Sequence, residues 1–207
     1  DLELDLPKEA EAWAGDFVQK NEIAGKQLVA IAPGGGKSWG EHAIYRRWDP
    51  ENFSYVAKEL RKKNYDVFFL LIGSSDERNM CRSIKKSLGE NAIDLCGKLP
   101  LLRSIALIKR CHVLLCNDGG ILHTAVSQGV NTISIFGPVD DTVYGPYPAS
   151  NRHYVVKAQG IACRPCYKNF KPKACTVHAC LKGIDTDRVV SIAEGILNQA
   201  VETGGRL

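Results

Sequence analysis

Short, mostly apolar runs alternate with amphipathic segments along the chain, and this alternation constrains the fold more than any other feature. Strands that are apolar on both faces belong to parallel sheets covered by helices on each side. Right-handed crossovers then give a doubly wound, Rossmann-like α/β domain. The predicted strands are 28–32, 66–72, 92–95, 112–116, 131–136 and 153–156, and the predicted helices are 7–21, 50–63, 76–88, 100–110, 124–128 and 185–201.

Ligands bind to such a sheet at the carboxyl ends of its strands, so the turns that follow the strands are the candidate site. One of these turns joins the strand 112–116 to a helix and contains Asp118, Gly119 and Gly120. Backbone amides at a helix start lack intrahelical partners and lie at the positive end of the helix dipole. Because glycines let a phosphate approach that backbone closely, the turn predicts a phosphate-bearing ligand. His123, one turn into the helix, is either a phosphate donor or a hydrogen-bonded packing residue.

A second turn, Pro33 to Ser38, contains three consecutive glycines followed by lysine. It is not a Walker P-loop, because Ile31 stands where that motif requires glycine. It also does not match the G-x-G-x-x-G pattern of dinucleotide-binding folds. Gly35 and Gly36 fit either a generic phosphate-facing loop or a plain turn at the end of a strand.

Two further groups near predicted helix starts have both a functional and a structural interpretation. Arg46 and Arg47 could hold a phosphate through paired, charge-assisted hydrogen bonds, or they could simply be solvated. Asp76 and Glu77 could accept hydrogen bonds from ribose hydroxyls, or they could only stabilise the first turn of a helix.

The eight cysteines fall into two groups. Four are scattered along predicted core elements, where we expect free thiols that behave as small hydrophobic residues in a cytoplasmic protein. The other four form a C-x2-C, C-x4-C cluster. Its spacing is compatible with a structural Zn²⁺ site, with two disulfides or with free thiols. The scattered cysteines are Cys81, Cys96, Cys111 and Cys116, and the clustered ones are Cys163, Cys166, Cys175 and Cys180.

Charge and hydropathy exclude two classes of function. The net charge of +4 is small and the charges are interleaved, so no nucleic-acid partner is predicted. No apolar stretch is long enough to span a bilayer.

The chain begins at Asp1 without an initiator Met, which leaves open that it is a part of a longer protein.

Several motifs, taken in order, resemble glycosyltransferase family 9, the ADP-heptose:lipopolysaccharide heptosyltransferase family. Each motif is weak by itself, but their order over most of the chain is specific. The segments that carry the resemblance are 32–36, 46–53, 70–73, 102–110, 117–123, 136–140, 145–147 and the cysteine motif that begins at 163.

The resemblance covers only the C-terminal half of that family and implies the C-terminal, donor-binding domain of a GT-B enzyme. Such enzymes transfer a sugar with inversion from a nucleotide-sugar donor, here ADP-heptose, to a lipopolysaccharide core or other glycan acceptor. The family's N-terminal domain, which carries the acceptor site and the catalytic base, has no counterpart here. The implied division is an entry helix (1–24), a Rossmann-like core (25–160), a Cys-rich loop (161–183) and a C-terminal helix (184–207).

Individual positions follow from the same resemblance. Gly35 and Gly36 match residues that line the donor diphosphate, and Arg46 or Arg47 matches the basic residue that pairs with it. Glu77 is similar in position to an acid that binds the nucleotide ribose. These assignments place the donor at the turns already selected from the residue pattern.

The turn after the strand 112–116 matches the family in most but not all positions. Asp118 matches an acid near the donor sugar, Gly119 and Gly120 match backbone donors, and His123 matches a histidine of the same turn. Family members usually carry Thr at the position of Gly119, which puts a strict heptose preference in doubt. No D-x-D-like metal pair is apparent, because Asp140 and Asp141 are adjacent and are predicted to lie in a loop, so the residues present require no divalent metal. We expect a protein of the cytoplasm, with the inner face of the membrane as a peripheral contact.

Three other functions compete with this interpretation. One is a GT-B transferase that uses another nucleotide sugar, and another is a nucleotide-binding module without transfer chemistry. The third is a dinucleotide-dependent oxidoreductase, which the broken G-x-G-x-x-G pattern disfavours.

Overall fold

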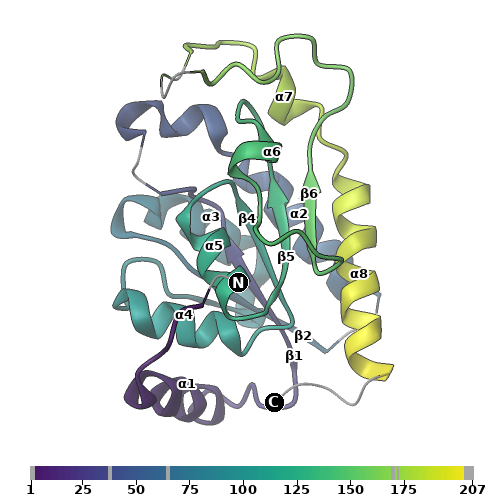
Figure 1. The fold of residues 1–207 in the computed structure, drawn as a ribbon. Helices are drawn as coiled ribbons and strands as arrows, with labels where there is room; N and C mark the ends of the chain where they lie inside the picture. Colours follow the sequence, from purple (N-terminus) through teal and green to yellow (C-terminus); the bar gives the residue numbers. More distant parts are fainter. Residues whose placement is uncertain (1–2, 37–38, 64–65, 169–170, 172, 203–207) are drawn as a thin grey trace.

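A six-stranded, all-parallel sheet lies between two layers of helices in the computed structural model, which describes residues 3–36, 39–63, 66–168, 171 and 173–202 (Figure 1). The strand order is β3-β2-β1-β4-β5-β6, and every neighbouring pair is parallel. This order confirms the predicted doubly wound, Rossmann-like fold. The strands are β1 (Gln27–Ala32), β2 (Val67–Leu71), β3 (Ala92–Asp94), β4 (Val113–Asn117), β5 (Asn131–Ile135) and β6 (His153–Val156).

The helices agree with the predicted segments wherever the hydrophobic period is long enough to be recognised. Helix α2 begins at Pro50, and the side chain of Asp49 caps it by accepting a hydrogen bond from the Glu51 amide at 2.9 Å. The helices are α1 (Lys8–Lys20), α2 (Pro50–Lys62), α3 (Arg78–Leu88), α4 (Leu101–Lys109), α5 (Gly120–Ser127), α6 (Asp141–Tyr144), α7 (Ala179–Lys182) and α8 (Thr186–Glu202), with 3₁₀ turns η1 (Gly40–Arg46), η2 (Ser75–Glu77) and η3 (Gly89–Asn91).

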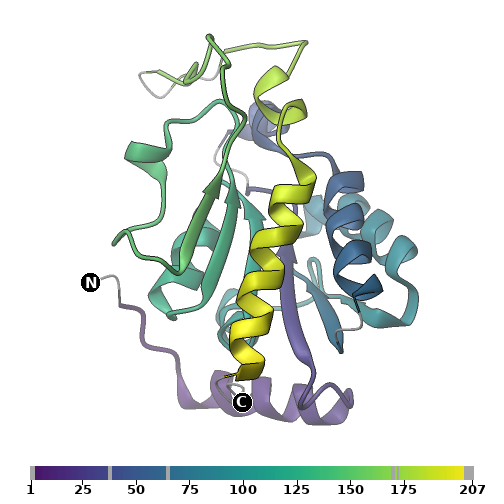
Figure 2. The same cartoon turned by 90° about the vertical axis from the view of Figure 1, so that its right-hand side faces the viewer.

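Side chains alternate between the two faces of the sheet and so build two separate cores. From β1, Val29 and Ile31 join the core under α2, α3 and α8, whereas Ala30 joins the core under α1, α4 and α5. Figure 2 shows α8 lying along one face of the sheet. Burial on both faces explains why the strands are apolar without interruption.

The strand order contains a switch point between β1 and β4, which is where doubly wound sheets bind their ligands. β1 lies between β2 and β4, so the direction of the chain's winding reverses between β1 and β4. The turn after Ala32 and the turn after Asn117 therefore lie side by side at the carboxyl edge of the sheet. The two glycine-containing turns selected from the sequence meet at this switch point.

Among the described residues, four short elements were not predicted: η1, η3, α6 and α7. The segment around Asp140 and Asp141, which the sequence suggested was a loop, is the start of α6, and the Asp140 side chain caps it. Helix α5 begins at Gly120, earlier than the predicted start at Thr124. Within the described residues, no helix combines the length and the apolar character that crossing a bilayer requires.

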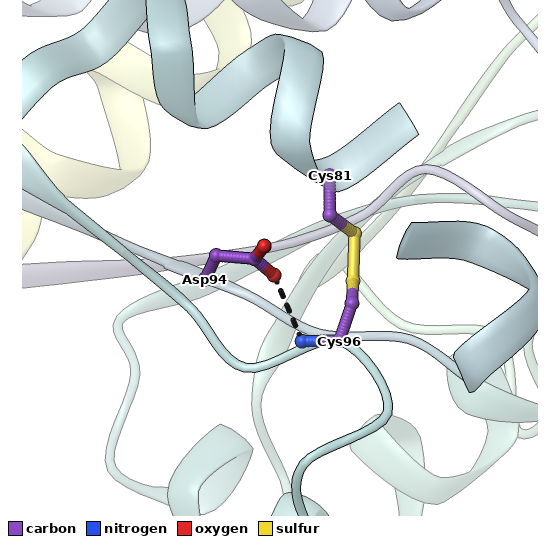
Figure 3. Close-up of side chains that lie close together, drawn as sticks. All are labelled: Cys81, Asp94 and Cys96. Carbon is purple, nitrogen blue, oxygen red and sulfur yellow. Dashed lines mark hydrogen bonds between the residues drawn. A yellow bond between two sulfur atoms is a disulfide. The ribbon is translucent and has the colours of Figure 1, made fainter. Parts of the chain in front are cut away.

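The prediction of four free core thiols is wrong for two of them. Cys81 in the first turn of α3 and Cys96 just after β3 form a disulfide, with their Cα atoms 6.4 Å apart (Figure 3). Helix α3 packs back along β3, which brings these two positions together. The Asp94 carboxylate accepts a hydrogen bond from the Cys96 amide at 3.0 Å. Cys111 and Cys116 are free and buried as expected, and burial raises the pKa of both thiols.

Candidate functional site

A cavity of about 450 Å³ opens at the switch point, at the carboxyl edge of the sheet. Four of the residues predicted to bind a ligand line it, namely Gly35, Gly36, Glu77 and Gly120. The remaining wall comes from the ends of β1 and β2, from the segment between β3 and α4, and from the N-terminal halves of α4 and α5: Ala32, Gly34, Ile72, Gly73, Ser74, Leu99, Leu101, Ser104, Ile121 and Thr124. Lys37 and Ser38, which belong to the same predicted loop, lie outside the described residues.

The glycine turn after β1 is held by two arginines. The carbonyl oxygen of Gly34 accepts a hydrogen bond from Nε of Arg47 at 2.7 Å, and the carbonyl oxygen of Gly35 accepts one from Arg46. Two carbonyl oxygens of the turn are therefore hydrogen bonded to guanidinium groups at the end of η1. Arg46 and Arg47 thus both act on the turn, although the sequence offered them as alternatives.

Glu77 fixes the opposite side of the same turn. It is only 4% exposed, and its two carboxylate oxygens accept hydrogen bonds from the amides of Gly36 (3.0 Å) and Ser74 (2.6 Å). A Cβ atom on Gly34 would lie 1.6 Å from Oε1 of Glu77, so only glycine fits there. Glu77 therefore shapes the cavity wall, and a ribose could use only its remaining lone pairs.

Asp118 and Arg46 form a buried ion pair beside the cavity. Oδ2 of Asp118 lies 3.4 Å from Nη1 of Arg46, and the two side chains are only 7% and 6% exposed. Burial raises the pKa of the Asp118 carboxyl, although the guanidinium of Arg46 acts in the opposite direction. Burial likewise lowers the pKa of Arg46, and Asp118 opposes that shift. The pair links the turn after β4 to the turn after β1.

Helix α5 presents its first residue, Gly120, to the cavity, and Gly119 directly precedes it. Gly119 is its N-cap and provides no side-chain cap, so the first amides are covered by no side chain of the capping residue. A Cβ atom on Gly119 would lie 2.7 Å from the carbonyl oxygen of Gly35. The two glycine turns are therefore in direct contact, which accounts for glycine at a position where the sequence resemblance expects Thr.

Asn117 is a positioning residue that the sequence reasoning did not select. Its side chain is fully buried, donates to the carbonyl oxygen of Pro33 at 2.6 Å and accepts from the amide of Trp48 at 3.0 Å. It thereby fastens the end of β1 and the start of α2 to the end of β4. The available signal was an amide side chain at the last position of an otherwise apolar strand.

His123 lies on α5, partly buried, and is not part of the cavity wall. Its charge acts on Asp118 in the direction that lowers the pKa of that carboxyl, but burial outweighs this effect. The structure therefore does not bring His123 into the cavity. We use the term glycine cradle for Gly34–Gly36, Arg46, Arg47, Glu77 and Asp118–Gly120.

The four clustered cysteines lie in residues 161–183, which we call the cysteine loop. Cys163 is exposed, Cys166 and Cys175 are partly buried, and Cys180 is buried on α7. Burial, followed by the charges of the other three cysteines, raises the pKa of the Cys180 thiol. None of these cysteines forms a disulfide among the described residues, and no three of their sulfurs lie within 4.8 Å of each other.

Arg164, between the first two cysteines, attaches this loop to the segment after β5. It donates to the carbonyl oxygens of Gly137 (2.7 Å) and Val139 (3.0 Å) and to Oδ1 of Asp141 (2.9 Å). Lys157 contacts the other oxygen of Asp141 at 2.6 Å. Burial opposes ionisation of Asp141, but the hydrogen bonds from Lys157 and Arg164 outweigh it and lower its pKa. Sequence reasoning missed Arg164 and Asp141 as partners.

Comparison with known proteins agrees with the resemblance seen in the motifs. The sequence profile of glycosyltransferase family 9 (heptosyltransferase) matches residues 1–176. The chain belongs to glycosyltransferase family 9. This family 9 chain is 25% identical over 146 residues to lipooligosaccharide heptosyltransferase 2 of Haemophilus influenzae, covering 68% of this chain and 40% of that protein.

Solved structures share the fold of the family 9 chain. A family 9 glycosyltransferase from Veillonella parvula superposes with a TM-score of 0.76 at 24% identity, covering 95% of this chain and 54% of that one. The dodecameric, iron-containing heptosyltransferase TibC of Escherichia coli, in complex with ADP-D-β-D-heptose, gives a TM-score of 0.55 at 15% identity, covering 86% of this chain and 46% of that one. The family 9 chain therefore spans about half the length of the proteins it matches.

Proposed function

We propose that this chain is the donor-binding domain of an inverting family 9 glycosyltransferase and that the glycine cradle holds the diphosphate of an ADP-sugar. The observation that carries the proposal is the cavity at the switch point, where the glycine turn after β1 meets the N-terminus of α5. In doubly wound sheets, nucleotides bind at this position.

The chemistry of the cradle suits a diphosphate leaving group. In an inverting transfer the bond from the anomeric carbon to the donor diphosphate breaks, and negative charge accumulates on the phosphate oxygens. The first amides of α5, near Gly119 and Gly120, and the positive end of its dipole are fixed in place to stabilise that charge as it develops. Arg46 and Arg47 add positive charge on the other side of the glycine turn.

The remainder of the cavity suits a nucleoside. Ile72, Leu99, Leu101 and Ile121 form an apolar wall against which a nucleobase could pack. Glu77 lines the same cavity and accepts a hydrogen bond from the Gly36 amide, so we assign it to the ribose. This arrangement supports the order base, ribose and diphosphate along the cavity.

The identity of the sugar and the acceptor rests on relatives. The Haemophilus protein is a lipooligosaccharide heptosyltransferase, and the TibC structure contains ADP-D-β-D-heptose. By this likeness we propose ADP-heptose as the donor and a lipopolysaccharide-core sugar as the acceptor. Gly119, which lacks the hydroxyl of Thr, makes the sugar preference the least constrained part of this proposal.

We further propose that a second domain faces the carboxyl edge and supplies the acceptor site and the catalytic base. The described cradle contains no carboxylate that is both exposed and directed at an acceptor: Glu77 and Asp118 are buried and already hydrogen bonded. Exposed apolar side chains follow the carboxyl ends of three strands, with Ile44 after β1, Leu101 after β3 and Val143 after β5. Such a rim is suited to an interdomain contact.

Ligand-induced thermal stabilisation tests the proposed function. The chain is titrated with ADP, UDP, GDP and NAD, and stabilisation that is greatest with ADP is the expected result. Stabilisation by UDP or GDP alone indicates another nucleotide sugar, and stabilisation by NAD alone would refute the donor-binding proposal. Sugar transfer by the full-length protein, absent from a variant that lacks this domain, separates an enzyme from a nucleotide-binding module.

The cysteine loop is proposed to hold a structural metal ion, with Zn²⁺ as the first candidate. Four thiols with no disulfide among them are a suitable donor set, and the amide of His178 donates to Sγ of Cys175 at 3.3 Å. The structural relative TibC contains iron, which makes iron the alternative metal. Binding would draw the four sulfurs closer together, because a tetrahedral site needs Zn–S distances of about 2.3 Å.

Elemental analysis of the purified chain decides this question. We expect about one equivalent of zinc or iron, lost in a variant with Cys166→Ser and Cys175→Ser. A wild-type chain that contains neither metal when purified under reducing conditions would exclude the metal site.

A further inference from the structure

A continuous stack of side chains connects the glycine cradle to the cysteine loop. The guanidinium carbon of Arg46 lies 5.0 Å from the ring centroid of Trp39, and Trp39 stacks on Tyr167 with centroids 4.3 Å apart and planes inclined by 23°. Tyr144 of α6 meets Tyr167 edge-on, with centroids 5.8 Å apart. The stack therefore joins residues from three distant parts of the sequence.

One end of the stack is fixed by the cysteine loop. Tyr167 directly follows Cys166, and the amides of both residues donate to the carbonyl oxygen of Pro138, at 3.2 and 2.9 Å. Tyr144 supports the ring of Tyr167 from the side. The position of the Tyr167 ring is thus set by the attachment of the cysteine loop to the segment after β5.

The other end of the stack reaches the cradle. Arg46 donates to the carbonyl oxygen of Gly35 and is paired with Asp118, so the orientation of its guanidinium determines where the glycine turn lies. Trp39 contacts that guanidinium through a cation–π interaction. Because Tyr167 stacks on Trp39, a change in the Tyr167 ring is passed to Arg46 through a single aromatic side chain.

A second contact holds η1 against the same loop. The ring of Tyr45, adjacent to Arg46, meets the ring of His178 edge-on, with centroids 5.5 Å apart. His178 lies between Cys175 and Cys180 in the sequence. The 3₁₀ turn that ends at Arg46 is therefore held by the cysteine loop at both Trp39 and Tyr45.

We propose that Tyr167 is a positioning residue for the donor diphosphate, acting through Trp39 and Arg46 on the glycine turn. The cysteine loop thereby contributes to donor affinity without touching the donor. This inference rests on the proposed function, because it assumes that the cradle binds the diphosphate of ADP. It predicts that loss of the Tyr167 ring weakens binding of the diphosphate specifically and not binding of the nucleoside.

The test compares Tyr167→Ala with Tyr167→Phe in the 207-residue chain. Calorimetric titration with ADP should give a Kd raised roughly threefold to tenfold in Tyr167→Ala and changed less than about twofold in Tyr167→Phe, which keeps the ring. The affinity for adenosine, which has no phosphate, should stay the same in both variants. Tyr55→Ala removes a half-exposed tyrosine from α2 and is the matched control.

The outcomes separate this inference from the proposed function. If the wild-type chain binds ADP and Tyr167→Ala binds it equally well, the inference is wrong and the donor site stands. Equal loss of ADP and adenosine affinity also overturns it, because that result shows a general structural defect. A wild-type chain that does not bind ADP overturns both. If Tyr167→Ala does not fold, Trp39→Leu replaces it, with the same ADP-specific loss expected.

Discussion

The glycine cradle and the cysteine loop lie at the same end of the molecule but are held in place in different ways. Arg46, Glu77 and Asp118 of the cradle are all buried and are fixed by hydrogen bonds or an ion pair. The cysteine loop contains only α7 and one isolated bridge as regular structure among its described residues. It is attached mainly through Arg164, Pro138 and Tyr167.

This difference separates two ways of shaping a binding site. The cradle is built on the sheet, and its charged side chains bond to the glycine turn or to one another. The cysteine loop lacks a core of its own, so its shape depends on a few contacts and on the proposed metal. Substitutions should therefore affect global stability in the cradle and local order in the loop.

The largest effect is expected for Asp118→Ala. The substitution removes the carboxylate that pairs with the buried guanidinium of Arg46, at a cost of about 3–5 kcal/mol in the free energy of unfolding. For a domain of this size, the melting temperature should fall by roughly 10 °C. Asp66→Ala is the control, because its pair with Lys26 is exposed and contributes about 0–1 kcal/mol. If the two variants melt together, the cradle is not the rigid region described here.

The next effect is expected for Gly119→Ala. Its Cβ would lie 2.7 Å from the carbonyl oxygen of Gly35, so the glycine turn must shift, at about 1–3 kcal/mol. Gly120→Ala is a closely matched control, since a Cβ there meets no atom within 4 Å and alanine favours the helix by about 0.5–1 kcal/mol. Urea unfolding of both variants measures the difference. Equal stability would show that the two turns do not press on each other.

Arg164→Ala should act locally, through the attachment of the cysteine loop. The loss of its hydrogen bonds to Gly137, Val139 and Asp141 should cost about 1–2 kcal/mol and loosen the loop. Limited trypsinolysis, followed by mass spectrometry, should then show faster cleavage after Lys168 and Lys173. Arg152→Ala, which loses a hydrogen bond to Gly129 outside the loop, is the control. Faster cleavage throughout the core would contradict a local role.

The smallest effect concerns acid and tests a histidine outside the cradle. Burial lowers the pKa of His112, whose Nδ1 accepts from the Leu28 amide at 3.1 Å. A base whose pKa is lowered by folding stabilises the folded state above the pKa it has in the unfolded chain, about 6.5 for histidine. That stabilisation is lost as the pH falls towards the lower pKa of the folded state. The raised pKa of Asp118 has the opposite sign, because its contribution is lost as the pH rises. Urea unfolding should show a lower free energy of unfolding at pH 5.5 than at pH 7.5, and His112→Asn should reduce this difference. If the difference is the same in the variant, another group causes the pH dependence.

The sheet could be predicted from the sequence because its signals are local. Apolar runs and helix caps such as Asp49 lie within a few residues of the elements they specify. The two glycine turns could be placed together because the carboxyl ends of parallel strands share an edge. The short elements η1, η3, α6 and α7 could not be predicted, because they span too few residues to show a hydrophobic period.

The individual contacts of the site were beyond the sequence because they join distant residues. Arg46 and Asp118 are 72 positions apart, and nothing in either segment identifies the other as its partner. The same limit explains the error at Cys81 and Cys96, whose spacing carries no sign that α3 folds back along β3. The roles assigned to the cradle residues in donor binding stay predictions.

The pairing of β1 with β4 has a consequence for folding. β1 and β4 are neighbours in the sheet, but the chain makes β2 and β3 between them, and Asn117 reaches back 84 positions to Pro33. Closing so long a loop is slow and gains nothing until both ends are in place. The cradle therefore cannot be assembled from either half of the chain alone. A nucleotide that binds there recognises the completed domain, and its binding during refolding would report the long-range step rather than the formation of helices.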